Sequence, residues 1–309
     1  YKINEDNASY SVTGLKEGNV NAQIVIPTEY KGLPVTGVGV SAFERCDTLT
    51  SVEIPNSVNE IANYAFRECS GLKSISIPGS VIRIGTDAFA DCGNLAIVEL
   101  SSGLTNIGTM AFRNCKSLKY INIPESVTFF GSSAFESCVN LEAITVDENN
   151  VKYKGEGNCV IERETNKLIA GCKTSVIPNS VSEIAPHAFH GCGLKEIEIP
   201  ASVTSIGNAA FEDCADLISV KIPISVVSIG TIAFTNCTSA KFYCEASSKP
   251  SGWDTRWKPN ENSVEWGCNN VKTNAQYDYV IGNNKAYLTN YKGSAKDVEI
   301  PAAIDGYEV

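Results

Sequence analysis

Hydrophobic and polar positions repeat along this chain with a nearly constant period. The clearest marker is an Ala-Phe pair followed three residues later by a cysteine. Successive phenylalanines are 23, 23, 23, 23, 54, 22 and 23 residues apart. They are Phe43, Phe66, Phe89, Phe112, Phe135, Phe189, Phe211 and Phe234. Because eight such matches are far beyond chance, the pattern predicts a solenoid of stacked repeats.

One unit, LTSVEIPNSVNEIANYAFRECSG at residues 49–71, shows which positions face the core. In an extended segment Val52 and Ile54 share one face, while the residues between them face the other way. Pro55 lacks a backbone N–H and ends the strand. Val58 and Ile61 are expected to face inward from the return path.

The rest of the unit is expected to bring Ala65 and Phe66 into the core from a short helical turn. A single coil cannot bury its own apolar face, so neighbouring coils must stack. The sequence therefore predicts a β-dominated α/β solenoid. We expect a right-handed superhelix with a parallel concave sheet, short return-path strands and helical turns.

The unit L-x-S-V-x-I-P-x-S-V-x-x-I-G-x-x-A-F-x-x-C-x-x resembles the leucine-rich repeat of BspA-like bacterial surface proteins, the Treponema-type repeat. The resemblance covers residues from about Val35 to Lys241. It implies a secreted or surface-attached protein, in many cases from a host-associated bacterium. Members of this family are associated with binding host matrix proteins, fibrinogen and other bacteria. The resemblance thus implies a protein partner, such as a host extracellular-matrix or plasma protein.

The repeat divides the chain into four predicted segments. Residues 1–34 are expected to form an N-terminal cap, 35–241 the solenoid and 242–275 a Trp-rich C-terminal cap. Residues 276–309 are predicted to begin a second cap and repeat module, truncated at Val309. The basis is the similarity of AYLTNYKGSAKDVEIPAAIDGYEV to the amino-terminal YSVTGLKEGNVNAQIVIPTEYKGLPV. We therefore expect a second repeat block downstream.

The 54-residue gap in the spacing indicates an insertion at about residues 147–172. In NCVIERETNKLIAGC, two apolar runs flank RETN, which predicts a β-hairpin. We expect the hairpin to pack against the flank of the solenoid. A binding loop is the alternative, because insertions in repeat proteins often decorate a binding face.

All three tryptophans, Trp253, Trp257 and Trp266, follow the last repeat. A solenoid needs a terminal cap over its last apolar coil, and large aromatic rings suit that role. A carbohydrate-binding site is the alternative, since indoles also stack on sugars. Buried rings would favour the cap, and accessible coplanar rings would favour the sugar site.

Eight of the twelve cysteines occupy a single repeat position. Their side chains would point inward in parallel, which favours buried free thiols over disulfides. The other four are Cys159, Cys172, Cys244 and Cys268. The sequence does not decide whether Cys159 forms a disulfide with Cys172, or Cys244 with Cys268.

The net charge and the absence of known catalytic motifs exclude several classes of function. The net charge is 25 − 35 = −10, which disfavours nucleic acid and anionic membrane surfaces as partners. No apolar run approaches the roughly 18 residues of a membrane span. Metalloprotease, nucleophile-elbow and P-loop motifs are absent from the sequence. His187 and His190 flank a core phenylalanine, so we expect both to project outward. We predict no catalytic residues, no cofactor and no metal.

The remaining candidate site is the outward face of the strands. Its candidate protein-binding residues are Glu53, Glu99, Tyr120, Asn122, Glu196, Glu198 and Lys221. The sequence thus predicts a non-catalytic, extracellular protein-binding or adhesion module, expected to be a monomer. The alternatives are a carbohydrate-binding protein that uses the tryptophans and a structural spacer that projects another domain.

Overall fold

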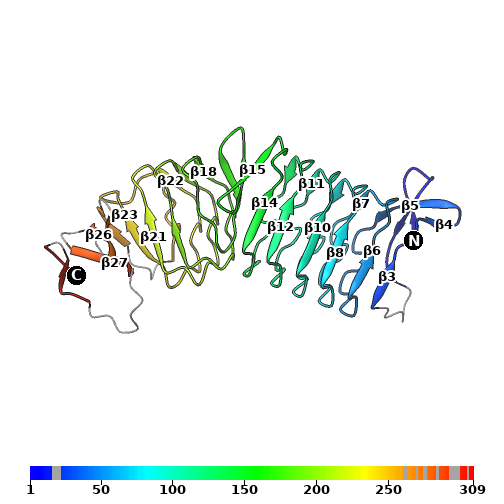
Figure 1. Cartoon of the computed structure of the whole chain (residues 1–309), viewed down its shortest axis with the longest axis horizontal. Coiled ribbons are helices and arrows are strands. Elements are labelled where there is room, and N and C mark those ends of the chain that lie inside the picture. Colours follow the sequence, from blue (N-terminus) through cyan, green and yellow to red (C-terminus); the bar gives the residue numbers. More distant parts are fainter. Residues whose placement is uncertain are drawn as a thin grey trace.

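The computed structural model describes residues 1–15, 22–259, 264–268, 271–273, 277–282, 285–291, 300–304 and 306–309. Figure 1 shows an elongated, gently arched molecule with the two termini at opposite ends and coils stacked between them. The coils pair through parallel strands along the molecule. The predicted solenoid of stacked parallel coils is therefore confirmed.

Each coil contributes one longer strand with alternating burial. In β10, for example, Val98 is buried and pairs with Ile75, while the exposed Glu99 pairs with Ser76 of β8. The register thus places equivalent repeat positions side by side. These long strands are β3 (Gln23–Val25), β6 (Ser51–Glu53), β8 (Ser74–Ile77), β10 (Ile97–Leu100), β12 (Tyr120–Ile123), β14 (Ala143–Val146), β19 (Glu196–Glu198), β21 (Ser219–Ile222), β23 (Lys241–Cys244) and β24 (Val264–Trp266).

The return path of each coil forms a second, shorter strand, as predicted. Ile61 pairs with Ile84, and Ile84 with Ile107, so the inward isoleucines stack in register. These short strands are β7 (Glu60–Ile61), β9 (Arg83–Ile84), β11 (Asn106–Ile107), β13 (Phe129–Phe130), β18 (Glu183–Ile184), β20 (Ser205–Ile206) and β22 (Ser228–Ile229). The longer strand β5 (Leu33–Val38) pairs with β7 at the amino-terminal end of this row.

The third side of each coil consists of turns, and the prediction of helical turns is wrong. The described part of the chain contains no helix. Tyr64 and Glu68, two residues on either side of Phe66, have φ angles of 60° and 59°. Such left-handed residues do not fit a right-handed helix. Instead, the Phe66 N–H donates to the Ala88 carbonyl of the next coil at 2.8 Å, so the turns form a ladder between coils.

The recurring phenylalanines and cysteines of the repeat fill the core beside this turn ladder. Phe66 and Phe89 stack with ring centroids 5.2 Å apart. The Cys69 thiol donates to the Phe43 carbonyl of the preceding coil at 3.0 Å, and Cys92 does the same to Phe66 at 3.1 Å. None of the twelve cysteines, all of which lie in described ranges, forms a disulfide. The free thiol ladder is confirmed.

The insertion forms β15 (Tyr153–Glu156), β16 (Cys159–Glu162) and β17 (Lys167–Ala170). β16 and β17 pair antiparallel, which confirms the predicted hairpin. β17 then pairs in parallel with β18, with Leu168 opposite Ile184, and so takes the place of a short strand. The core is divided within the insertion into two clusters, with Val160 in the first and Ile161 in the second.

The Trp segment continues the coil path beyond the last clear repeat. Trp253 forms a parallel bridge with Ile229, and the Phe234 N–H donates to the Trp257 carbonyl at 2.8 Å. Trp257 thus takes the place that alanine holds in the regular turns. We propose that residues 242–275 cap the solenoid as a divergent coil; residues 260–263, 269–270 and 274–275 lie outside the described part.

A hairpin near each terminus has the same pairing. Glu29 of β4 (Glu29–Tyr30) lies opposite Pro34 of β5, and Ala303 of β28 (Ala303–Ile304) lies opposite Glu308 of β29 (Tyr307–Glu308). Each hairpin turns at a glycine of positive φ, 77° at residue 32 and 86° at residue 306.

The strands around these hairpins also correspond. The amino-terminal order is β1 (Lys2–Ile3), β2 (Tyr10–Val12), β5, and the carboxy-terminal order is β26 (Tyr277–Gly282), β27 (Lys285–Tyr291), β29. β25 (Val271–Thr273) adds to β26. We propose that residues 276–309 repeat the amino-terminal cap; residues 276, 283–284, 292–299 and 305 lie outside the described part.

Candidate binding surface

The predicted surface residues lie on the outward side of the long strands, called here the long-strand face. The insertion separates them into two groups. Glu196, Glu198 and Lys221 lie together, with Glu198 paired directly opposite Lys221. The other four belong to coils before the insertion and are exposed: Glu53, Glu99, Tyr120 and Asn122.

Tyr120 provides the aromatic contact of the first group. Its side chain is 61% exposed, and Ile97, at the same repeat position one coil earlier, is 56% exposed. The Tyr120 hydroxyl donates to Glu142 Oε2 at 3.0 Å. This bond to a carboxylate raises the pKa of Tyr120. A tethered, exposed ring beside an isoleucine is a suitable anchor for a protein ligand, since interfaces favour tyrosine.

The second group lines a groove of about 700 Å³. Its floor is formed by β19, β21 and β23, and Asp278 of the terminal hairpin β26–β27 contributes to the wall. Four carboxylates line the groove, from Glu196, Glu198, Glu245 and Asp278. Lys221 is the one basic residue among the described lining residues. The groove is therefore acidic and suits a positively charged ligand segment.

Lys221 lies half-buried within this acidic lining. Burial lowers the pKa of its ammonium, and the carboxylates of Glu198, Asp278 and Glu196 act in the opposite direction. One lysine is thus surrounded by three carboxylates. Acidic side chains therefore outnumber basic ones by four to one among the described lining residues.

Two tryptophans do not present a ring face to solvent. Trp253 is 2% exposed and Trp257 is 3% exposed, and their rings cross at 70° with centroids 5.0 Å apart. Trp253 Nε1 donates to the Val226 carbonyl at 3.0 Å, which satisfies its buried donor. Trp266 is partly exposed and tilted by 41° from Trp253. The arrangement has the burial that a cap requires and lacks coplanar rings.

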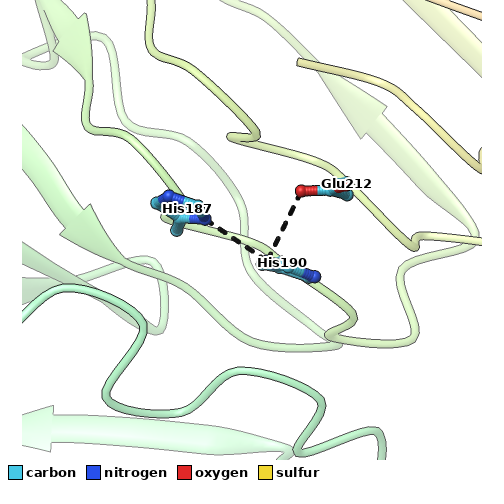
Figure 2. Close-up of side chains that lie close together, drawn as sticks. All are labelled: His187, His190 and Glu212. Carbon is cyan, nitrogen blue, oxygen red and sulfur yellow. Dashed lines mark hydrogen bonds and ion pairs between the residues drawn. The ribbon is translucent and has the colours of Figure 1, made fainter. Parts of the chain in front are cut away.

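The expectation that His187 and His190 project outward is wrong. Both side chains are half-buried, and their Nδ1 atoms are 3.3 Å apart. Glu212 approaches them from the next coil, as Figure 2 shows.

The sequence contains a signal for this grouping of side chains. Glu136, His190 and Glu212 each follow the repeat phenylalanine by one residue. The 54-residue gap conceals the fact that their coils are neighbours.

The family of the chain follows from its repeat, which the structure shows as stacked coils with paired strands. The model of the "BspA type Leucine rich repeat region", in six copies, matches residues 36–157 and 165–247. The chain belongs to the BspA-type leucine-rich repeat family. This family is defined by a structural repeat and not by a catalytic motif. No curated protein matches the sequence.

Solved structures share the fold of this BspA-type chain. The pneumococcal vaccine antigen PcpA has a TM-score of 0.67 and 22% identity, covering 85% of this chain and 76% of its own. A leucine-rich repeat protein from Bacteroides ovatus has a TM-score of 0.53 and 23% identity, covering 86% and 97%. One from Eubacterium ventriosum has a TM-score of 0.53 and 24% identity, covering 80% and 71%. At these identities the likeness shows the fold alone.

Among the described residues of the BspA-type chain, no helix is long and apolar enough to span a membrane.

Proposed function

We propose that this BspA-type chain is a non-catalytic, extracellular protein-binding module at a bacterial surface, and that a protein ligand binds its long-strand face. The observation that carries the proposal is the acidic groove over β19, β21 and β23. The groove combines a volume suited to extended side chains with four carboxylates. Host extracellular-matrix and plasma proteins are the ligand class that we favour, because they present many basic segments.

The groove also contains apolar surface. Val176 lines it and is 69% exposed. Ile177 and Ile197 lie beneath it and are mostly buried. A basic side chain has an aliphatic stem and a charged head, so it is matched by an apolar floor with carboxylates around it. This combination favours lysine or arginine of a protein ligand over a neutral sugar.

The experiment is a binding series with fibrinogen, fibronectin and mucin immobilised on a biosensor surface. Wild-type protein is compared with the double variant Glu196→Lys/Glu198→Lys. The matched control is Glu60→Lys/Glu183→Lys, which also reverses two charges but on the short strands β7 and β18. We expect at least one ligand to lose about tenfold or more in affinity with the double variant, because like charges meet across the contact. The control should bind as wild type does.

Salt provides the second test. Exposed charges are screened over about 8–10 Å at physiological ionic strength. Binding through the groove should therefore weaken steadily between low and high salt. Binding that neither salt nor the double variant changes would contradict the proposal. Binding to mucin that disappears on deglycosylation would instead favour a sugar ligand.

A further inference from the structure

A second cluster of functional side chains lies on the turn side of the solenoid, where the insertion joins the two blocks. His187, His190 and Glu212 each offer a ligand atom, and these atoms all lie within 4.8 Å of one another. Figure 2 shows the two imidazoles side by side and the Glu212 carboxylate directed toward His190. The cluster lies on the turn side of each coil, whereas the proposed ligand face lies on the side formed by the long strands.

The turn ladder explains why these residues meet. The Ser137 N–H donates to the His190 carbonyl at 3.0 Å, so the coil of Phe135 directly neighbours the coil of Phe189. Glu136, His190 and Glu212 then form one row across three coils. Earlier in the same row, Glu44 Oε1 lies 3.7 Å from Arg67 Nη1, so this position holds an ordinary ion pair there. At the junction two carboxylates flank an imidazole.

The distances match those of a tetrahedral metal centre. The two histidine Nδ1 atoms are 3.3 Å apart. His190 Nδ1 lies 3.6 Å from Glu136 Oε2 and 3.9 Å from Glu212 Oε2. Zinc bonds of about 2.0–2.2 Å imply ligand–ligand separations of about 3.3–3.6 Å in a tetrahedron. The ligand atoms of His187, His190 and Glu212 all lie within 4.8 Å of one another, so side-chain shifts of about 1 Å would bring them to these separations.

Asp213 fixes the tautomer that a metal requires. His190 Nε2 lies 3.0 Å from Asp213 Oδ2, and a carboxylate only accepts, so Nε2 carries the hydrogen. In the neutral ring, Nδ1 then presents a lone pair toward His187 and the two glutamates. Carboxylate–histidine pairs of this kind orient the ligands of zinc sites.

A small cavity provides an independent observation. It has a volume of about 10 Å³ and is lined by Glu136, His187, His190 and Ser133, among others. That is close to the least volume that holds one water molecule. Ser133 is 7% exposed, and its buried Oγ has no hydrogen-bond partner among the described residues. An unpartnered buried hydroxyl costs free energy, so a polar occupant is indicated.

We infer that the junction between the two blocks is a divalent metal site, best suited to zinc. His187 Nδ1, His190 Nδ1 and Glu212 are the ligands, and Glu136 or a water molecule takes the fourth position. The bound ion connects the coils of Phe189 and Phe211, and with Glu136 in the fourth position it also connects the coil of Phe135. It is a structural clamp within the solenoid and is independent of the proposed ligand face.

The experiment is calorimetric titration of EDTA-treated, full-length protein with zinc chloride. We expect one strong site per chain and a rise in the melting temperature that saturates at the same stoichiometry. Cobalt(II) is a spectroscopic substitute and should show the intense visible absorption of tetrahedral coordination.

Variants separate this site from adventitious binding by surface carboxylates. His187→Gln and His190→Gln should abolish the strong site, and Asp213→Asn should weaken it by about 10–100-fold through loss of ligand orientation. The matched control is Glu44→Gln, which occupies the same repeat position as Glu212 and should leave binding unchanged. Equal melting temperatures without metal would show that the variants fold. The proposal is overturned if wild-type binding survives both histidine substitutions, or if cobalt gives only a weak octahedral spectrum.

Discussion

Gly171 lies so close to Phe189 that a Cβ atom at residue 171 would overlap the Cε1 atom of the ring. The Gly171 N–H donates to the Ala188 carbonyl at 2.8 Å, the same bond that Phe66 makes to Ala88 in a regular coil. Gly171 therefore takes the place of a repeat phenylalanine. Its backbone lies against the Phe189 ring, where the second stack of rings begins after the insertion.

Substituting this glycine should destabilise the solenoid. Gly171→Ala places a methyl group inside the Phe189 ring, which is held by stacking on Phe211 at 4.9 Å. We expect a loss of about 1–3 kcal/mol in the free energy of unfolding, as for other overpacked cores. Denaturant titration measures it. Gly93→Ala is the control, since a Cβ there meets nothing within 4 Å. Equal stabilities for the two variants would contradict this account of the junction.

The sequence predicted the periodic parts of this fold well. The alternation around Val52 correctly placed the strands, and the spacing of the cysteines correctly indicated free thiols. The turns were mispredicted because left-handed backbone at Tyr64 leaves no trace in residue type. The junction was missed for another reason. The insertion hides the fact that Glu136 and His190 belong to adjacent coils, which only three-dimensional stacking reveals.

The phenylalanine stack should contribute strongly to stability. Phe112 is fully buried and stacks on Phe89 at 5.5 Å and on Phe135 at 5.9 Å. Phe112→Ala should cost about 3–5 kcal/mol, the usual range for deleting a buried aromatic ring. Phe129→Ala is the comparison, because that ring is 51% exposed on a short strand. A melting temperature unchanged by Phe112→Ala would be incompatible with the assigned repeat.

The buried thiols make stability sensitive to alkaline pH. Burial raises the pKa of Cys138 from 9.0 to about 12. Between these values the folded state holds a proton that the unfolded state releases, so the free energy of unfolding falls as pH rises. One such thiol accounts for about 1.4 kcal/mol per pH unit. Cys138→Ala should flatten the decline by that amount between pH 9 and 11. If the free energy of unfolding fell equally steeply with pH in the variant and in the wild type, the effect would be refuted.

Ile232 occupies a turn position whose backbone conformation does not suit a β-branched residue. Ile232 has a φ of 51°, a left-handed conformation that a β-branched residue adopts at a cost. Asparagine tolerates it, and Asn236 already has a φ of 62° in the same turn. Ile232→Asn should therefore raise the free energy of unfolding by about 1 kcal/mol. Ile224→Asn, at a residue that is 69% exposed, is the reference. Calorimetry on the two variants would detect the difference, and a lower stability for Ile232→Asn would exclude relief of strain.

The central claim, that a protein ligand occupies the acidic groove, is tested most directly by carboxyl footprinting of the complex. Carboxylates are labelled with a carbodiimide and glycine ethyl ester, with and without the matrix protein bound in the biosensor series, and labelling is quantified by mass spectrometry. The account predicts that labelling of Glu196 and Glu198 falls on binding, while labelling of Glu60 on the short strands stays the same. Protection of Glu60 with full labelling of Glu196 and Glu198 would contradict it.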